Sequence, residues 1–132
     1  ELNVEGPFGY FTLERTGRSQ PLLMVASGTG ISPFRSMVRS VPGLDYTLVH
    51  GVRTLAERYQ HEDFDPLRVV SCVSREDGGT IRGRVTSWVR SAELAPGTKA
   101  LLCGNCDMIY EVYDLLLAKG LGADDIAAEV YF

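Results

Sequence analysis

Short apolar runs alternate with helix-forming segments from residue 22 onward, and this alternation constrains the fold more than any other feature of the sequence. Short continuous apolar runs are typical of strands that are buried on both faces of a parallel sheet. We expect such strands at Leu22–Ser27, Tyr46–His50, Leu67–Val73, Lys99–Cys103 and Ile126–Phe132. Because helical segments and short connections separate them, the sequence predicts an α/β fold with a five-stranded parallel sheet and helices on both faces.

The helices between these strands are marked by residues that commonly begin or end helices. Ser32 followed by Pro33 is a typical helix start, and Gly120 is a typical helix end. The expected helices run from Ser32–Pro33 to about Ser40, from Thr54 toward Tyr59, from Val85 to Ser91 and from Asp107 to Lys119.

The overall composition excludes several classes of protein. The 132 residues are enough for one domain, and the net charge of −4 argues against a nucleic-acid binder that neutralises phosphates. No run of 18 apolar residues is present, so no membrane span is expected. Three cysteines favour a reducing compartment, and we therefore expect a cytoplasmic protein. Cys103-x-x-Cys106 lacks a second cysteine pair, so no metal site is expected.

The first 20 residues differ from the rest of the chain. A Gly6-Pro7 turn followed by an alternating pattern up to Leu13 suggests the end of a preceding β-structure, and residues 16–21 have the composition of a polar linker. The sequence therefore predicts a boundary after residue 20, with residues 21–132 forming the α/β domain.

Four segments are expected at one edge of the sheet, where the strands of parallel sheets end and ligands bind. They are residues 28–33, 51–53, 74–84 and 103–108. Gly28-Thr29-Gly30 precedes a helix start, where free N–H groups and the helix dipole favour a phosphate; a plain strand–helix turn would also need small residues. The G-x-G-x-x-G fingerprint is not met, because Pro33 occupies the place of its third glycine.

Basic residues follow the second and third strands. Arg53 stands where a typical NAD site carries Asp or Glu, and Ser74, Arg75 and Arg84 come after the third strand. Arginine and hydroxyl donors suit an adenosine 2′-phosphate, and each charge-assisted contact is worth roughly 1.5–3 kcal/mol. The pattern favours NADP over NAD, and the alternative is that these arginines form a solvated face.

The last two strands end in residues that have a structural and a functional interpretation. After the fourth strand, Cys103-Gly104-Asn105 could place a thiol against a flat ring, although a lone cysteine is more often a small buried side chain. Met108 is expected in the core. Tyr131 and Phe132 could pack on the sheet.

Together, a series of motifs in a fixed order resembles the ferredoxin–NADP reductase superfamily, and most closely its bacterial NADPH-dependent type. The resemblance covers nearly the whole chain and implies the strand order 3-2-1-4-5. The motifs are Gly6-Pro7-x-Gly9-x-Phe11, Ala26-Ser27-Gly28-Thr29-Gly30-Ile31-Ser32-Pro33-Phe34-Arg35, His50-Gly51-Val52-Arg53, Val73-Ser74-Arg75-Glu76, Gly83-Arg84-Val85, Cys103-Gly104-Asn105-x-x-Met108-Ile109 and Glu129-x-Tyr131-Phe132.

The resemblance also implies a role for each group of residues. Those expected to bind the 2′-phosphate are Ser74, Arg75 and Arg84, with Arg53 nearby. Those expected to contact the rest of the nucleotide are Gly28, Thr29, Gly30, Pro33, Gly104, Asn105 and Met108. Cys103 and Glu129 would line the hydride-transfer site. A terminal aromatic, Phe132 or Tyr131, would stack on the flavin and move aside for nicotinamide.

The function implied by the resemblance is hydride transfer between NADPH and FAD, with electrons exchanged with ferredoxin or flavodoxin. Residues 1–20 would then be the end of an FAD-binding barrel and a linker, and residues 21–132 the NADP-binding domain. The flavin motif Arg-x-Tyr-Ser is absent from this sequence. We therefore expect FAD to be bound mainly by a missing N-terminal domain, and this chain to bind NADP weakly without turnover.

Two alternatives have different consequences. The same domain could belong to the reductase component of an oxygenase or to a flavohaem-type reductase, which would change the electron partner. The chain could also be a non-catalytic nucleotide-binding module. Cys103, Glu129 and the terminal aromatics argue against that second alternative, because a pure binding module needs none of them.

Overall fold

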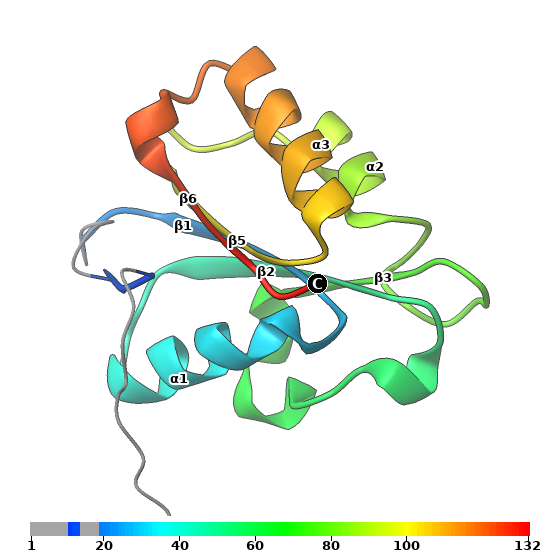
Figure 1. Cartoon of the computed structure of the whole chain (residues 1–132). Coiled ribbons are helices and arrows are strands. Elements are labelled where there is room, and N and C mark those ends of the chain that lie inside the picture. Colours follow the sequence, from blue (N-terminus) through cyan, green and yellow to red (C-terminus); the bar gives the residue numbers. More distant parts are fainter. Residues whose placement is uncertain (1–10, 14–18) are drawn as a thin grey trace, which may run out of the picture.

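The computed structural model describes residues 11–13 and 19–132, so most of the segment expected to end a preceding β-structure lies outside the described residues. A parallel sheet forms the middle layer, with α1 on one face and α2 and α3 on the other (Figure 1). The strands are β1 (Leu22–Ser27), β2 (Tyr46–Val52), β3 (Val69–Val73), β4 (Ile81–Arg82), β5 (Lys99–Gly104) and β6 (Ile126–Val130). The α-helices are α1 (Ser32–Ser40), α2 (Val85–Ser91) and α3 (Cys106–Ala118).

The described sheet has six strands in the order β4-β3-β2-β1-β5-β6, so the prediction of five strands in the order 3-2-1-4-5 is wrong. The difference is β4, which pairs in parallel with β3 at the edge of the sheet through Cys72↔Ile81 and Val73↔Arg82. Two residues, one half-buried and one exposed, carry no hydrophobic pattern from which a strand could be predicted. The other strands follow one another as β3-β2-β1-β5-β6.

Short 3-10 turns shift several of the expected element ends. The turns are η2 (Gly28–Ile31), η3 (Leu55–Glu57), η4 (His61–Asp63), η5 (Pro66–Arg68) and η6 (Ala123–Asp125). Leu67 was expected in a strand but lies in η5 with 96% of its surface exposed, because the Asp65 side chain caps this turn by accepting from the Leu67 N–H. Ser32 is already helical rather than the N-cap of α1, because η2 runs directly into the helix.

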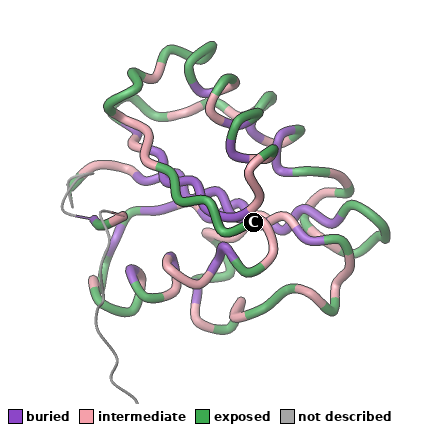
Figure 2. Tube along the Cα trace, in the orientation of Figure 1, coloured by how far each residue is buried: buried purple, intermediate pink, exposed green. Residues whose placement is uncertain are grey.

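The alternation of side chains along the strands divides the core in two. Met24 and Leu48 point to the face covered by Phe34 of α1. Val25 and Val49 point to the opposite face, where α2 and α3 pack. Figure 2 shows that the central strands are buried along their length, whereas the C-terminal strand β6 and the tail that follows it are largely exposed. Among the described residues, no helix has the length and apolar character needed to cross a membrane.

Candidate functional site

A cleft of about 860 Å³ lies at the carboxyl ends of the strands. It is built from the connections that follow β1, β2, β3 and β5, together with the start of α2 and the end of the chain. The lining residues are Ser27, Gly28, Thr29, Gly51, Val52, Arg53, Glu57, Tyr59, Ser74, Arg75, Gly83, Arg84, Val85, Thr86, Asn105, Asp107, Met108, Glu111 and Phe132. Nine of the residues proposed from the sequence therefore share this cleft: Gly28, Thr29, Arg53, Ser74, Arg75, Arg84, Asn105, Met108 and Phe132.

The loop after β1 is held tightly against the end of β5. The Ser27 hydroxyl accepts a hydrogen bond of 2.8 Å from the Asn105 N–H. A Cβ atom added to Gly30 would lie 2.3 Å from the Cys103 carbonyl oxygen, so only glycine allows this approach. Gly30 is therefore buried behind the loop, and Gly28 and Thr29 form the cleft wall. The first N–H groups of a helical turn have no partners within it, which makes this wall suited to an anion.

The ends of β2 and β3 form the basic side of the cleft. The Ser74 N–H donates to the Val52 carbonyl over 3.1 Å, and the Arg75 N–H donates to the Arg53 carbonyl over 2.9 Å. These backbone hydrogen bonds place Arg53, Ser74 and Arg75 side by side at the carboxyl-terminal edge of the sheet. Arg84 joins them as the residue just before α2.

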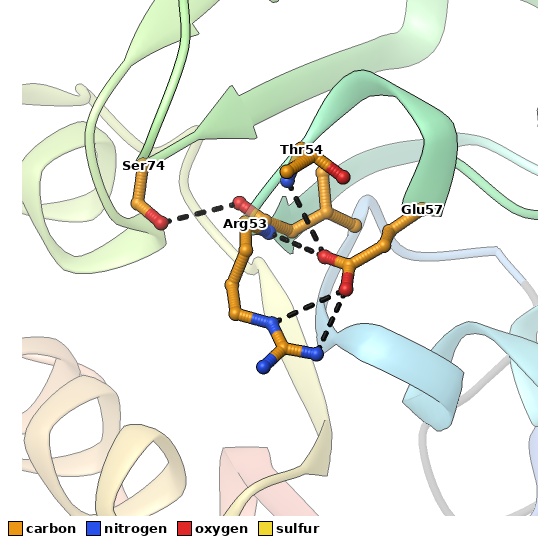
Figure 3. A network of polar contacts seen from close by, with 5 residues as sticks. Arg53, Thr54, Glu57 and Ser74 are labelled. Carbon is orange, nitrogen blue, oxygen red and sulfur yellow. Dashed lines mark hydrogen bonds and ion pairs between the residues drawn. The ribbon is translucent and has the colours of Figure 1, made fainter.

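The Glu57 carboxylate binds Arg53 at several points (Figure 3). It accepts from the Arg53 backbone N–H at 2.9 Å, from Arg53 Nη2 at 2.8 Å and from the Thr54 N–H at 3.3 Å. The side-chain hydrogen bond from Arg53 is the main cause that lowers the pKa of Glu57. Among the described residues, the side chains of Arg75 and Arg84 make no ion pair or hydrogen bond, so their charges are available to a ligand.

Glu57 was not among the residues proposed from the sequence, although Thr54-x-x-Glu57 is a recognisable capping box. Asp107 and Glu111 also line the cleft from the first turns of α3 and were missed, because nothing in the local pattern separates them from surface acids. Met108 was expected in the core, and it both lines the cleft and packs against the core cluster beneath α3.

The residues expected near a nicotinamide are close to one another but only one lines the cleft. Cys103 is fully buried and pairs with Glu129 in the β5–β6 register. Burial, helped by the Glu129 charge, raises the pKa of the Cys103 thiol to about 12, so the thiol is neutral. Burial also raises the pKa of the Tyr131 phenol, which neighbours Cys103.

Phe132 lies over the loop that follows β1. A Cβ atom added to Gly28 would be 3.5 Å from the Phe132 ring, although 57% of the Phe132 surface is still exposed. The backbone holds this tail in place, since the Tyr131 N–H donates to the Gly104 carbonyl over 2.9 Å and the Cys106 N–H donates to the Phe132 carbonyl over 2.8 Å. The anchor of the tail is therefore made by main-chain atoms and does not involve the Phe132 ring.

Three other proposed residues lie outside the cleft. Pro33 lies in the first turn of α1, and Gly30 and Gly104 are buried where the loops after β1 and β5 cross. These positions shape the loops behind the cleft. Within the described ranges, no three His, Cys, Asp or Glu side chains gather in a way that could hold a metal ion.

Known proteins share this fold and part of this sequence. The flavodoxin/ferredoxin–NADP reductase of Escherichia coli (strain K12) is 31% identical over 129 residues, which cover 78% of this chain and 50% of that protein. The ferredoxin–NAD(P)(+) reductase component of the naphthalene 1,2-dioxygenase/salicylate 5-hydroxylase systems of Ralstonia sp is 32% identical, covering 99% of this chain and 44% of that protein. The chain spans about half the length, or less, of the curated relatives it matches.

The fold is also found in a ferredoxin NADP+ reductase from Neisseria gonorrhoeae whose crystal structure contains FAD and NADP. That structure aligns with a TM-score of 0.78 at 22% identity and covers 95% of this chain and 61% of that one. Residues 24–114 match the family described as the oxidoreductase NAD-binding domain, and this segment includes the cleft loops after β1, β2 and β3. The chain belongs to that family of NAD-binding domains of oxidoreductases.

Proposed function

We propose that this chain is the NADP(H)-binding domain of a larger, cytoplasmic FAD-dependent reductase that exchanges electrons with ferredoxin or flavodoxin. The observation that carries the proposal is the basic side of the cleft, where Arg75 and Arg84 have free charges beside Arg53. An unphosphorylated dinucleotide offers no group at this point that would use two free arginines.

In the proposed complex, Ser74, Arg75 and Arg84 bind the adenosine 2′-phosphate. Charge-assisted contacts of this kind are worth roughly 1.5–3 kcal/mol each, so two of them would favour NADP over NAD by at least about 100-fold. Arg53 stands nearby in a direction fixed by Glu57. The N–H groups at Gly28 and Thr29 would receive the pyrophosphate.

At the other end of the nucleotide, the nicotinamide would enter next to Asn105 and Met108. The Phe132 ring covers Gly28 and would have to move to admit it. Cys103 and Glu129, adjacent across β5 and β6, would then lie at the hydride-transfer site, with the neutral thiol packing against the ring. Tyr131 remains the competing candidate for the stacking aromatic, but its side chain does not line the cleft.

The bound flavin would supply the hydride acceptor, and a domain outside this chain would bind most of it. This chain alone is then expected to bind NADP weakly and not to turn over. A related candidate is the reductase component of an oxygenase system, favoured by the similarity over 99% of the chain to the Ralstonia protein of that name. In that case the nucleotide cleft would act in the same way and only the electron acceptor would differ.

Calorimetric titration of this chain with NADP+, NAD+ and 2′-AMP tests the proposal. We expect NADP+ to bind at least about 100-fold more tightly than NAD+, and 2′-AMP to bind measurably without the nicotinamide half. Equal affinity for NADP+ and NAD+ would contradict the assignment of the basic side to the 2′-phosphate.

A further inference from the structure

Two histidines outside the cleft contact its phosphate-binding wall from behind. His50 of β2 is fully buried on the α1 face of the sheet, and its Nε2 atom lies 2.8 Å from the Gly28 carbonyl oxygen. Its other ring nitrogen, Nδ1, lies 2.8 Å from Nε2 of His61 in η4. Neither histidine is a lining residue of the cleft.

The two hydrogen bonds that link His61, His50 and the Gly28 carbonyl form a relay, and the chemistry of these groups fixes which one donates in each bond. A carbonyl oxygen only accepts, so His50 Nε2 must carry the proton and donate it to Gly28. In a neutral imidazole the second nitrogen then accepts, so His50 Nδ1 accepts from the Nε2–H of His61. The order of donation is therefore His61 to His50 to Gly28.

This contact decides which way the peptide between Gly28 and Thr29 faces. In a trans peptide the C=O and the following N–H point in opposite directions. Because His50 holds the Gly28 carbonyl toward the interior, the Thr29 N–H is turned the other way, toward the cleft that Gly28 and Thr29 line. The reversed peptide would present a carbonyl oxygen to an anion and repel it.

The position of His61 is fixed independently of the cleft. It begins η4, and in the same turn Asp63 forms an ion pair with Arg35 of α1. The charged neighbours that act on His61 are Arg58, which lowers its pKa, and Glu62, which raises it. His61, the first donor of the relay, is thus held near α1 by the Arg35–Asp63 ion pair.

We propose that His50 and His61 are positioning residues that hold the Gly28–Thr29 peptide with its N–H toward the pyrophosphate of the bound dinucleotide. This inference rests on the proposed function, because it concerns the same nucleotide. In this proposal the Thr29 N–H contacts the pyrophosphate, and the two histidines orient that N–H without touching the ligand themselves.

The two hydrogen bonds of the relay are expected to persist in mild acid. Burial is the main cause that lowers the pKa of His50 to about 4, so its Nδ1 remains a bare acceptor above that pH. His61 can take up a proton on its free Nδ1 and still donate through Nε2. The hydrogen bond to Gly28 therefore persists whichever charge Arg58, Glu62, Asp63 and Arg35 leave on His61.

Two substitutions of the half-buried His61 distinguish the effect of its hydrogen bond to His50 from the effect of its ring packing. His61→Gln keeps an N–H donor and His61→Phe keeps the ring volume without a donor. We expect His61→Phe to weaken NADP+ binding about five- to tenfold and to change 2′-AMP binding by less than about twofold, because 2′-AMP lacks the pyrophosphate. His61→Gln should stay within about twofold of the wild type for both probes.

The outcomes separate this inference from the function on which it rests. A wild-type chain that binds neither 2′-AMP nor NADP+ would overturn the proposed function itself. If the wild type binds both, the positioning role is overturned when His61→Phe leaves NADP+ affinity unchanged, or when it weakens both probes equally, as a general loss of structure would.

A measurement on the wild type keeps the inference testable if His61→Phe does not fold. Ring ¹⁵N chemical shifts should show His50 protonated at Nε2 and unprotonated at Nδ1 at neutral pH. Addition of NADP+, but not of 2′-AMP, should shift the Thr29 amide resonance. The opposite His50 tautomer, or an unchanged Thr29 amide on NADP+ binding, would overturn the proposal.

Discussion

Arg53 and Glu57 occupy the same corner of the cleft with opposite charges. A cation at the end of β2 suits a phosphate, whereas an acid at this place suits free ribose hydroxyls. Arg53 Nε and Nη2 both donate to the same Glu57 oxygen, Oε1, over 3.2 and 2.8 Å, and this ion pair offsets the Arg53 charge. The proposed preference for a phosphate would then depend mainly on Arg75 and Arg84. Arg53 is then a donor of fixed direction rather than the main source of attraction.

Replacement of Arg75 tests this division of roles. We expect Arg75→Ala to weaken NADP+ binding by about tenfold or more and to leave NAD+ binding nearly unchanged, because one charge-assisted contact to the 2′-phosphate is lost. Parallel titrations with the two nucleotides measure the effect. Arg90→Ala is the matched control, since Arg90 is an exposed arginine at the end of α2 that does not line the cleft. A loss of similar size in the control would point to long-range charge instead.

Removing the Glu57 charge should act in the opposite direction. A unit charge about 8 Å from a phosphate charge contributes roughly 0.5 kcal/mol in water. We expect Glu57→Gln to tighten NADP+ binding about two- to threefold at low salt, with the gain disappearing at high salt because of screening. Weaker binding by the variant would show that Glu57 acts mainly by orienting Arg53.

At the scale of elements, the cleft depends on the crossing of the loops after β1 and β5. Gly104 adopts a φ of +133°, and a Cβ atom there would lie 2.3 Å from Ser27 Oγ and 2.7 Å from the Ser27 carbonyl oxygen. We expect Gly104→Ala to lower the free energy of unfolding by about 3 kcal/mol or more, because backbone strain and a clash with main-chain atoms add together.

Gly97→Ala is the control for that substitution. Gly97 also has a positive φ, of +78°, but nothing lies within 4 Å of an added Cβ atom. The control should therefore show the conformational cost alone, about 1 kcal/mol. Urea denaturation of the two variants measures the difference, and equal losses would mean that the loop crossing relaxes to accept the methyl group.

The sequence predicted the longer elements because each carries a local signal. Leu22–Ser27 and Val85–Ser91 have the predicted bounds, since an apolar run and a helical pattern are properties of neighbouring residues. The edge strand at Ile81–Arg82 was missed because only its neighbour β3 makes it a strand. His61 lies 11 positions after His50, beyond the end of β2 and the η3 turn, and no local sequence pattern predicts a contact between the two rings.

At the scale of the whole molecule, the exposed tail is the feature that bears most directly on the proposed FAD-dependent function. Val130, Tyr131 and Phe132 are exposed apolar residues on and after the edge strand β6. Removing Phe132 from the proposed FAD-containing parent should raise the affinity for the nicotinamide nucleotide, because the ring no longer competes for its place. Titration of the oxidised enzyme with NADP+ measures this, and Tyr131→Ser is the comparison. An effect in Tyr131→Ser alone would assign the stacking role to Tyr131.

The two histidines give the whole molecule a pH-dependent stability whose sign follows from burial. Burial lowers the pKa of His50 from 6.5 to about 4 and also lowers that of His61. The unfolded chain therefore binds more protons than the folded chain below pH 6.5, so stability is fully present above that pH and decreases as the pH falls toward 4. For His50 alone, we expect the free energy of unfolding to drop by about 2 kcal/mol between pH 7.5 and 5.

Urea denaturation at a series of pH values measures this loss. The carboxylates with lowered pKa values, Glu57 and Asp125, titrate at lower pH and leave the window from 7.5 to 5 to the histidines. His50→Gln should be less stable at every pH but should show a flatter profile, because the slope depends on proton uptake and not on the absolute stability. A wild-type profile that is flat from pH 7.5 to 5 would mean that His50 is protonated in the folded chain, and its hydrogen bond from His61 could then not exist.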